Sequence, residues 1–210
     1  MNANIVVIDY GMGNVRSVEK ALAHCGAAVE VTADAEKIHA ATHVVLPGVG
    51  AFGGAMKELK KRRLIEPIRE TIAADKPFLG ICLGLQVLFE KSEESPRVEG
   101  LGVIAGQVKR FRTYLKVPHM GWNQLRLRQP GAVFEGVGED PFVYFVHSYY
   151  VVPDDAAWVA ATTDYDGEFV SAVRRGRCIA TQFHPEKSQA VGLRMLRNFI
   201  GLTEEAPADS

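Results

Sequence analysis

The chain has 210 residues, 24 of them Lys or Arg and 25 Asp or Glu, which gives a formal net charge of −1 and argues against nucleic acid as a partner. With 47% apolar and 23% charged residues the composition is that of a globular protein, and the length predicts one domain over 1–202. No apolar run approaches the roughly 20 residues that cross a bilayer, so a membrane protein is excluded.

The N-terminal segment has neither the basic region nor the apolar block and cleavage site of a signal peptide. Three scattered cysteines, Cys25, Cys82 and Cys178, suit reduced thiols better than a disulfide framework. Together these features predict a cytoplasmic protein.

The first half of the chain alternates short β-branched runs with helical patterns, which favours βαβ units and a parallel sheet. The predicted strands are Ile5–Ile8, Val29–Val31, His43–Gly50 and Pro77–Ile81. Helices are expected over Val15–Cys25 and Leu83–Lys91, and a charged amphipathic stretch covers Ala55–Ala74.

The second half has shorter strands that predict an antiparallel or mixed addition to the parallel core. They are expected at Gly106–Arg110, Phe142–Tyr150, Trp158–Thr163, Phe169–Arg174 and Cys178–Phe183, before a closing helix over Ser188–Ile200. The tail 203–210 has no apolar face and is predicted to be disordered. The fold class is therefore α/β, a doubly wound mixed sheet.

Cys82 stands in the strongest local motif, Gly-Ile-Cys-Leu-Gly at 80–84, between a buried strand and a helix. This is the pattern of a nucleophile elbow with sulfur as the nucleophile. The flanking glycines permit a sharp turn, and main-chain N–H groups at the helix start favour a thiolate. A small buried apolar cysteine is the alternative, but the complete motif favours catalysis.

His184 and Glu186 supply the base that a cysteine nucleophile needs. Residues i and i+2 of an extended chain project to the same side, and Pro185 keeps His184 out of helical geometry. We therefore predict His184 as general base and acid, oriented by Glu186. Taken alone, these residues fit a surface turn at a strand end better, and it is the elbow at Cys82 that favours the triad.

Acyl transfer also requires donors for the oxyanion. The N–H of Leu83 follows the nucleophile directly, and the turn at 47–50, with Gly48 and Val49, offers a second donor after an earlier strand. From the spacing alone, this turn fits a plain strand exit equally well.

The sequence does not fit a dinucleotide-binding site or a metal site. Gly11 and Gly13 begin a dinucleotide fingerprint, but Arg16 occupies the third glycine position. The histidines other than His184 show no metal-ligand spacing. No metal or cofactor is expected.

Three motifs in order, PGVGAF (47–52), GICLGLQ (80–86) and QFHPEKS (182–188), resemble the class I glutamine amidotransferases, which hydrolyse glutamine through a Cys-His-Glu triad. DYGMGN (9–14), PHMGWN (118–123) and YFVHSYY (144–150) are similar to one branch of that family, the glutaminase subunits of imidazole glycerol phosphate synthases in histidine biosynthesis. The resemblance covers nearly the whole chain and implies a flavodoxin-like core with added antiparallel strands.

The resemblance implies roles for further residues. Gln86, one helical turn beyond Cys82, would hold glutamine together with main-chain groups of Ser148 and Tyr149. A (β/α)₈-barrel cyclase subunit would form a heterodimer with this chain and receive the ammonia. Hydrolysis would stay weak until that cyclase binds its ligand, with the Gly48–Val49 peptide as the switch. The implied docking residues are Asn14, Pro118, Met120, Trp122, Tyr144 and Lys187.

Three alternatives remain open at this point. The chain could be a glutaminase that serves another synthase, which PHMGWN and YFVHSYY disfavour. It could be a catalytically silent binding subunit, which the intact set of Cys82, His184 and Glu186 disfavours. It could also be a cysteine peptidase, for which hydrolysis of peptides without any partner would be the sign.

Overall fold

Parallel strands rich in Val, Ile and Leu form the centre of the structure, a computed structural model that describes residues 3–129 and 131–203. The sheet runs in the order β2-β1-β3-β4-β13, and all neighbours in this part are parallel. The five strands are β1 (Asn4–Ile8), β2 (Ala28–Thr32), β3 (His43–Gly48), β4 (Phe78–Cys82) and β13 (Cys178–Thr181). This is the flavodoxin-like order, so the predicted doubly wound sheet is confirmed.

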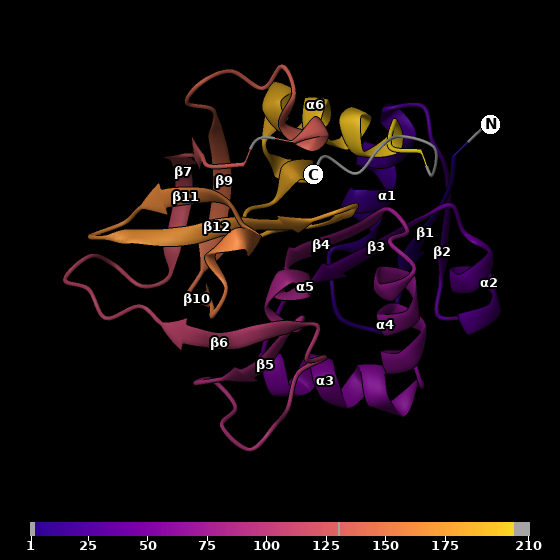
Figure 1. The fold of residues 1–210 in the computed structure, drawn as a ribbon, viewed down its shortest axis with the longest axis horizontal. Helices are drawn as coiled ribbons and strands as arrows, with labels where there is room; N and C mark the ends of the chain where they lie inside the picture. The colour runs from indigo at the N-terminus through magenta and orange to yellow at the C-terminus, as the bar shows by residue number, and fades with distance from the viewer. Residues whose placement is uncertain (1–2, 130, 204–210) are drawn as a thin grey trace.

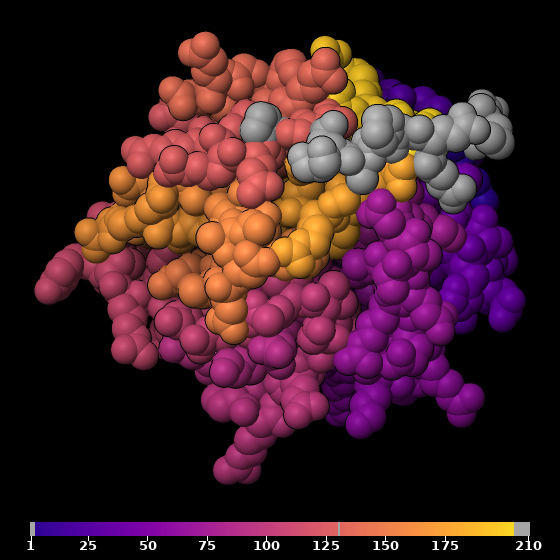
Figure 2. All heavy atoms as spheres, in the orientation of Figure 1, coloured from indigo at the N-terminus to yellow at the C-terminus, as the bar shows by residue number. Residues whose placement is uncertain are grey.

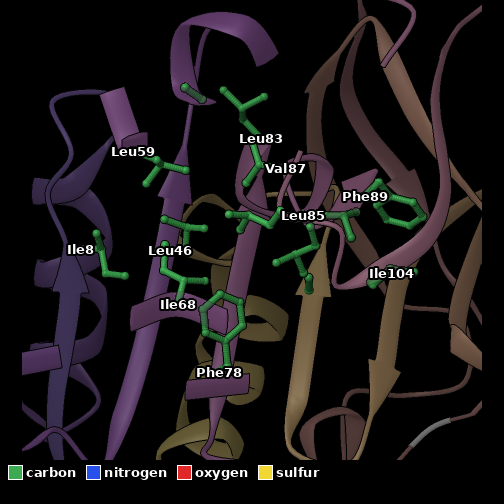
Figure 3. Close-up of a cluster of buried hydrophobic side chains, with 14 of the residues drawn as sticks. Ile8, Leu46, Leu59, Ile68, Phe78, Leu83, Leu85, Val87, Phe89 and Ile104 are labelled. Atoms are coloured by element: carbon green, nitrogen blue, oxygen red, sulfur yellow. The ribbon is translucent and has the colours of Figure 1, made fainter. Parts of the chain in front are cut away.

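Helices cover both faces of this sheet (Figure 1). α1 (Val15–His24) and α6 (Gln189–Ile200) lie together on one face, and α2 (Ala35–Ala40), α3 (Phe52–Lys61) and α4 (Ile65–Ala73) lie on the other. Alternate residues of each strand enter two separate cores, since Val7 of β1 joins the α1 and α6 side while Ile8 joins the α3 and α4 side. Figure 3 shows part of the second core, where Ile8, Leu46 and Phe78 of three strands lie near Leu59 and Ile68.

Beyond β13 the sheet continues in the order β13-β12-β10-β6-β5, with antiparallel pairing as far as β6 and parallel pairing between β6 and β5. A separate two-stranded sheet pairs β7 with β9. The segment between β6 and β7 projects from the body at the left of Figures 1 and 2. The bounds are β5 (Phe89–Ser92), β6 (Ile104–Arg110), β7 (His119–Gln124), β8 (Arg126–Leu127), β9 (Phe142–His147), β10 (Tyr149–Pro153), β11 (Val159–Asp164) and β12 (Glu168–Arg175). Short 3₁₀ turns are η1 (Ala132–Phe134), η2 (Ala156–Trp158) and η3 (Pro185–Lys187).

Three predicted elements are wrong in their extent or pairing. The helix expected over Leu83–Lys91 stops after one turn, α5 (Leu83–Gln86), because the next residues pair as β5 with β6. The strand expected over Phe142–Tyr150 is two strands, since β9 pairs with β7 whereas β10 pairs with β6 and β12. The strand at Cys178 belongs to the parallel core beside β4, not to the antiparallel addition.

The amphipathic stretch predicted over Ala55–Ala74 forms two helices, α3 and α4, with Arg63 at a φ of 58° between them. The predicted tail 203–210 lies outside the described residues, apart from Thr203. Within the described ranges, no helix is long and apolar enough to cross a membrane.

Candidate active site

Cys82 lies at the turn from β4 into α5, with φ at 55° and ψ at −107°. This backbone conformation is strained for a residue with a side chain and is typical of a nucleophile elbow. The two predicted glycines are both required. A Cβ on Gly80 would lie 2.9 Å from the Cβ of Ala180, and a Cβ on Gly84 would overlap the carbonyl oxygen of Leu46. The sharp turn therefore depends on the close approach of β3, β4 and β13.

His184 and Glu186 form a buried pair just beyond the end of β13. Nδ1 of His184 lies 2.8 Å from Oε1 of Glu186, and the two side chains are only 2% and 1% exposed. The main chain is anchored as well, because His184 donates its N–H to the carbonyl of Tyr144 at 3.0 Å. As predicted from the i, i+2 spacing, the carboxylate orients the imidazole.

The electrostatics of this pair favour a charged imidazole. Burial acts to lower the pKa of His184, but Cys82 and Glu186 raise it, with a net pKa of about 9. Nδ1 of His184 is bonded to Glu186, so its buried Nε2 is the ring nitrogen that interacts with Cys82. An imidazolium Nε2–H in this position is suited to protonate a leaving group in the cavity next to Cys82.

A cavity of about 370 Å³ brings most of the predicted residues together. Its lining combines the predicted nucleophile and base with the expected oxyanion and glutamine residues: Val49, Cys82, Leu83, Gln86, Ser148, Tyr149 and His184. Gly48 is directly paired with Cys82 across β3 and β4, and Glu186 stands behind His184. Gly50, Val146 and His147, which lie in the quoted motifs but had no assigned role, also line the cavity, and so does Glu94, which lies outside those motifs.

Gln182 is a further residue that the motif analysis missed. Its Nε2 donates to Sγ of Cys82 at 3.7 Å, and its Oε1 accepts from Nε2 of Gln86 at 3.1 Å. The same amide of Gln86 also donates to the carbonyl of Tyr149 at 3.2 Å. Gln182 precedes His184 by two residues, so the spacing that identified Glu186 could have identified it too.

The residues expected at a docking surface fall into two groups. On the β7–β9 sheet, Trp122 pairs with Tyr144, and their rings meet edge-on with centroids 6.1 Å apart. Met120 and Trp122 are 60% and 46% exposed, and Nζ of Lys187 lies 5.8 Å from the ring centre of Tyr144. Pro118 lines the catalytic cavity.

Asn14 comes from another part of the chain. It precedes α1, and its side chain makes no capping hydrogen bond there. A Cβ on the neighbouring Gly13 would lie 3.4 Å from the carbonyl oxygen of Pro47, which puts this segment beside the end of β3. In the ranges 3–129 and 131–203, no group of three His, Cys, Asp or Glu side chains could hold a metal ion.

Comparisons with known proteins agree with one another. The family model described as glutamine amidotransferase class-I matches residues 6–202. The chain is 53% identical over 197 residues to the imidazole glycerol phosphate synthase subunit HisH of Rhodopirellula baltica, which covers 93% of this chain and 96% of the relative. It is 52% identical over 202 residues to the protein of the same name from Moorella thermoacetica, with 96% of both chains covered.

Solved structures share the fold at low sequence identity. A glutamine amidotransferase crystal structure matches with a TM-score of 0.73 and 20% identity, covering 94% of this chain and 99% of the other. The structure of PurLQS from Thermotoga maritima matches with a TM-score of 0.72 and 19% identity, covering 95% and 96%.

Proposed function

The chain belongs to the class I glutamine amidotransferase family, and we propose that it is the ammonia-producing subunit of an imidazole glycerol phosphate synthase in histidine biosynthesis. The family membership confirms the resemblance found in its motifs. The observation that carries the proposal is the cavity in which Cys82 and His184 meet, with Glu186 bonded to the imidazole.

The triad supports hydrolysis of the glutamine side-chain amide in two stages. Sγ of Cys82 attacks the amide carbon, and His184 gives a proton to the leaving nitrogen, which departs as ammonia. Water, deprotonated by His184, then attacks the glutamyl thioester and releases glutamate and the free thiol. The main-chain N–H groups of Leu83 and Val49, two residues that line the cavity with Cys82, are the proposed donors to the oxyanion.

Glutamine binding is assigned to lining residues of the same cavity. Gln86 and the segment Ser148–Tyr149 provide an amide and main-chain groups there, and Glu94 adds a carboxylate to the same lining. These groups suit the amino and carboxylate ends of an amino acid. The reaction requires no metal or cofactor.

The proposed partner is a (β/α)₈-barrel cyclase subunit that forms a heterodimer with this chain and takes up the ammonia. Outward side chains of the β7–β9 sheet support a docking surface there, since Met120, Trp122 and Phe142 are 60%, 46% and 52% exposed. Large apolar and aromatic side chains gathered on one face are typical of protein interfaces. The sheet adjoins the cavity, because Val146 pairs with Met120 and also lines the catalytic site.

We also propose that the protein is located in the cytoplasm. The three free cysteines support this location, because reduced thiols persist there. A single domain over 1–202 is also proposed, in line with the span of the family match.

The test is glutamate release from glutamine by the purified chain, alone and then with a cyclase subunit and its nucleotide ligand. Strong stimulation in the full mixture and no activity in Cys82→Ala are expected. The Cys82→Ala complex should still make product when ammonium salt is supplied. Full activity without the cyclase would contradict the histidine-pathway assignment and favour a glutaminase of another synthase.

A further inference from the structure

Two buried histidines lie behind the proposed glutamine site. His119 of β7 and His147 of β9 are paired across the two-stranded sheet, with Nδ1 of His119 3.0 Å from Nε2 of His147. They are 3% and 6% exposed. Tyr165 stacks on the ring of His119, and Phe111 packs against both imidazoles. The proposed catalytic steps use neither histidine.

The hydrogen bonds at the two ends of this pair fix where each proton lies. Oδ1 of Asn123 accepts from the N–H of Gln124 at 2.8 Å, so its Nδ2 is the atom 3.2 Å from Nε2 of His119. An amide nitrogen can only donate, hence Nε2 of His119 accepts and Nδ1 carries the proton. That proton is donated to Nε2 of His147, whose own Nδ1–H points at the carbonyl of Tyr149, 2.8 Å away.

This arrangement uses neutral imidazoles alone, and the surroundings keep them neutral. Burial lowers the pKa of His119 to about 4 and that of His147 to about 3. No proton is left over to be passed along, because every nitrogen of the pair is already a donor or an acceptor. The pair therefore orients groups and does not relay protons.

The carbonyl that receives these bonds belongs to the proposed glutamine site. The oxygen of Tyr149 also accepts from Nε2 of Gln86, which is bonded to Gln182, which in turn donates to Sγ of Cys82. Hydrogen bonds thus run without a break from Asn123 of β7 to the nucleophile. His147 and Tyr149 both line the cavity that holds Cys82.

We propose, on the basis of the proposed glutaminase function, that His119 and His147 are positioning residues that fix the Tyr149 carbonyl and the glutamine-binding segment around it. The pair joins this carbonyl to β7, which also carries the exposed Met120. A shift of β7 would therefore be passed to the Tyr149 carbonyl through these hydrogen bonds, which form only when both rings carry their proton on Nδ1.

Two variants of His147 separate orientation from packing. In His147→Asn the side-chain NH₂ occupies the place of Nδ1 and can still donate to Tyr149, whereas His147→Gln puts its amide near Nε2 and loses that bond. With the cyclase and its ligand present, His147→Gln should raise the KM for glutamine about tenfold and change kcat less than about twofold. His147→Asn keeps the donor to Tyr149 but loses the acceptor for His119, so it should recover most of the lost affinity, with a KM about threefold above that of the unchanged protein. Equal losses in the two variants, or no change in His147→Gln, would overturn the proposal.

Nitrogen-15 NMR of the histidine rings in the unchanged chain is a second test that does not depend on activity. Both His119 and His147 should be neutral at pH 7 with the proton on Nδ1, the minority form of free imidazole. The exposed His24 at the end of α1 serves as an internal reference. A proton on Nε2 of either buried ring would overturn the positioning role, even in an active enzyme. An inactive protein with both predicted tautomers would instead contradict the proposed function.

Discussion

Replacing Glu186 with Gln removes the negative charge of the triad and keeps the shape of the side chain. The His184–Glu186 contact is 2.8 Å, and both side chains are almost completely buried. Burial lowers the pKa of His184 while Cys82 and Glu186 raise it, and the net value is about 9 against an ordinary 6.5. A gap of about 2.5 units corresponds to roughly 3 kcal/mol in favour of the imidazolium.

Cys82 and Glu186 both raise the pKa of His184, so loss of the carboxylate alone should lower that pKa by about one unit. Because the folded pKa of about 9 exceeds the unfolded 6.5, proton binding stabilises the protein fully below pH 6.5. That contribution disappears as the pH rises through about 9. Glu186→Gln should therefore be less stable than the unchanged chain at low pH, and the difference should shrink by roughly 1 kcal/mol towards high pH. Glutamine hydrolysis should fall about 100-fold, because the base loses its orientation.

Urea unfolding of both proteins from about pH 6 to about pH 9.5, together with an NMR titration of the His184 ring, measures these effects. Glu168→Gln is the matched control, since Glu168 is an exposed carboxylate bonded to Arg128. Its stability should run parallel to that of the unchanged chain over this range. A stability difference for Glu186→Gln that stays constant with pH, or an unchanged His184 titration, would refute the reasoning.

Three further predictions concern the turn, the thiol and the docking surface. Gly84→Ala should lose about 3 kcal/mol in urea unfolding because its Cβ overlaps a main-chain carbonyl of β3. Gly54→Ala, inside α3 and 3.3 Å from a flexible methionine, should gain about 0.5 kcal/mol, and a loss there would contradict the packing argument. Iodoacetamide at neutral pH should label Cys82 before Cys178, whose pKa burial raises to about 12, as peptide mass spectrometry can show. Trp122→Ala should weaken cyclase binding about tenfold by calorimetry, and an unchanged affinity would move the interface elsewhere.

The elbow at Cys82 and the pairing of His184 with Glu186 were predictable because their signals are local. Gly80 and Gly84 bracket Cys82 within five residues, and His184 and Glu186 are separated by one. Short-range geometry of this kind does not depend on how distant strands pair. The same spacing argument would have included Gln182, which was missed because an amide does not suggest a catalytic role by itself.

The pairing partners of the strands were not predictable from local sequence. Residues 87–91 have no residue that forbids a helix, yet Phe89 pairs with Ile104 and extends the sheet as β5. Likewise, nothing in the residues of β13 indicates whether it pairs in parallel or antiparallel. In the fold it lies between β4, to which it is parallel, and β12, to which it is antiparallel. Tertiary pairing outweighs local preference at such places.

The strained backbone of Cys82 is stabilised by the sheet and not by its own turn. A residue in this region of conformational space costs about 1–3 kcal/mol. Gly48 of β3 is in register with Cys82 on one side, and Thr181 of β13 pairs with Ile81 on the other. β13 pairs with β4 although β5 to β12 lie between them in the sequence, so the elbow and the base depend on the same long-range strand pairing. The catalytic geometry should therefore be lost together with the global fold, without an active intermediate in which the elbow alone is formed.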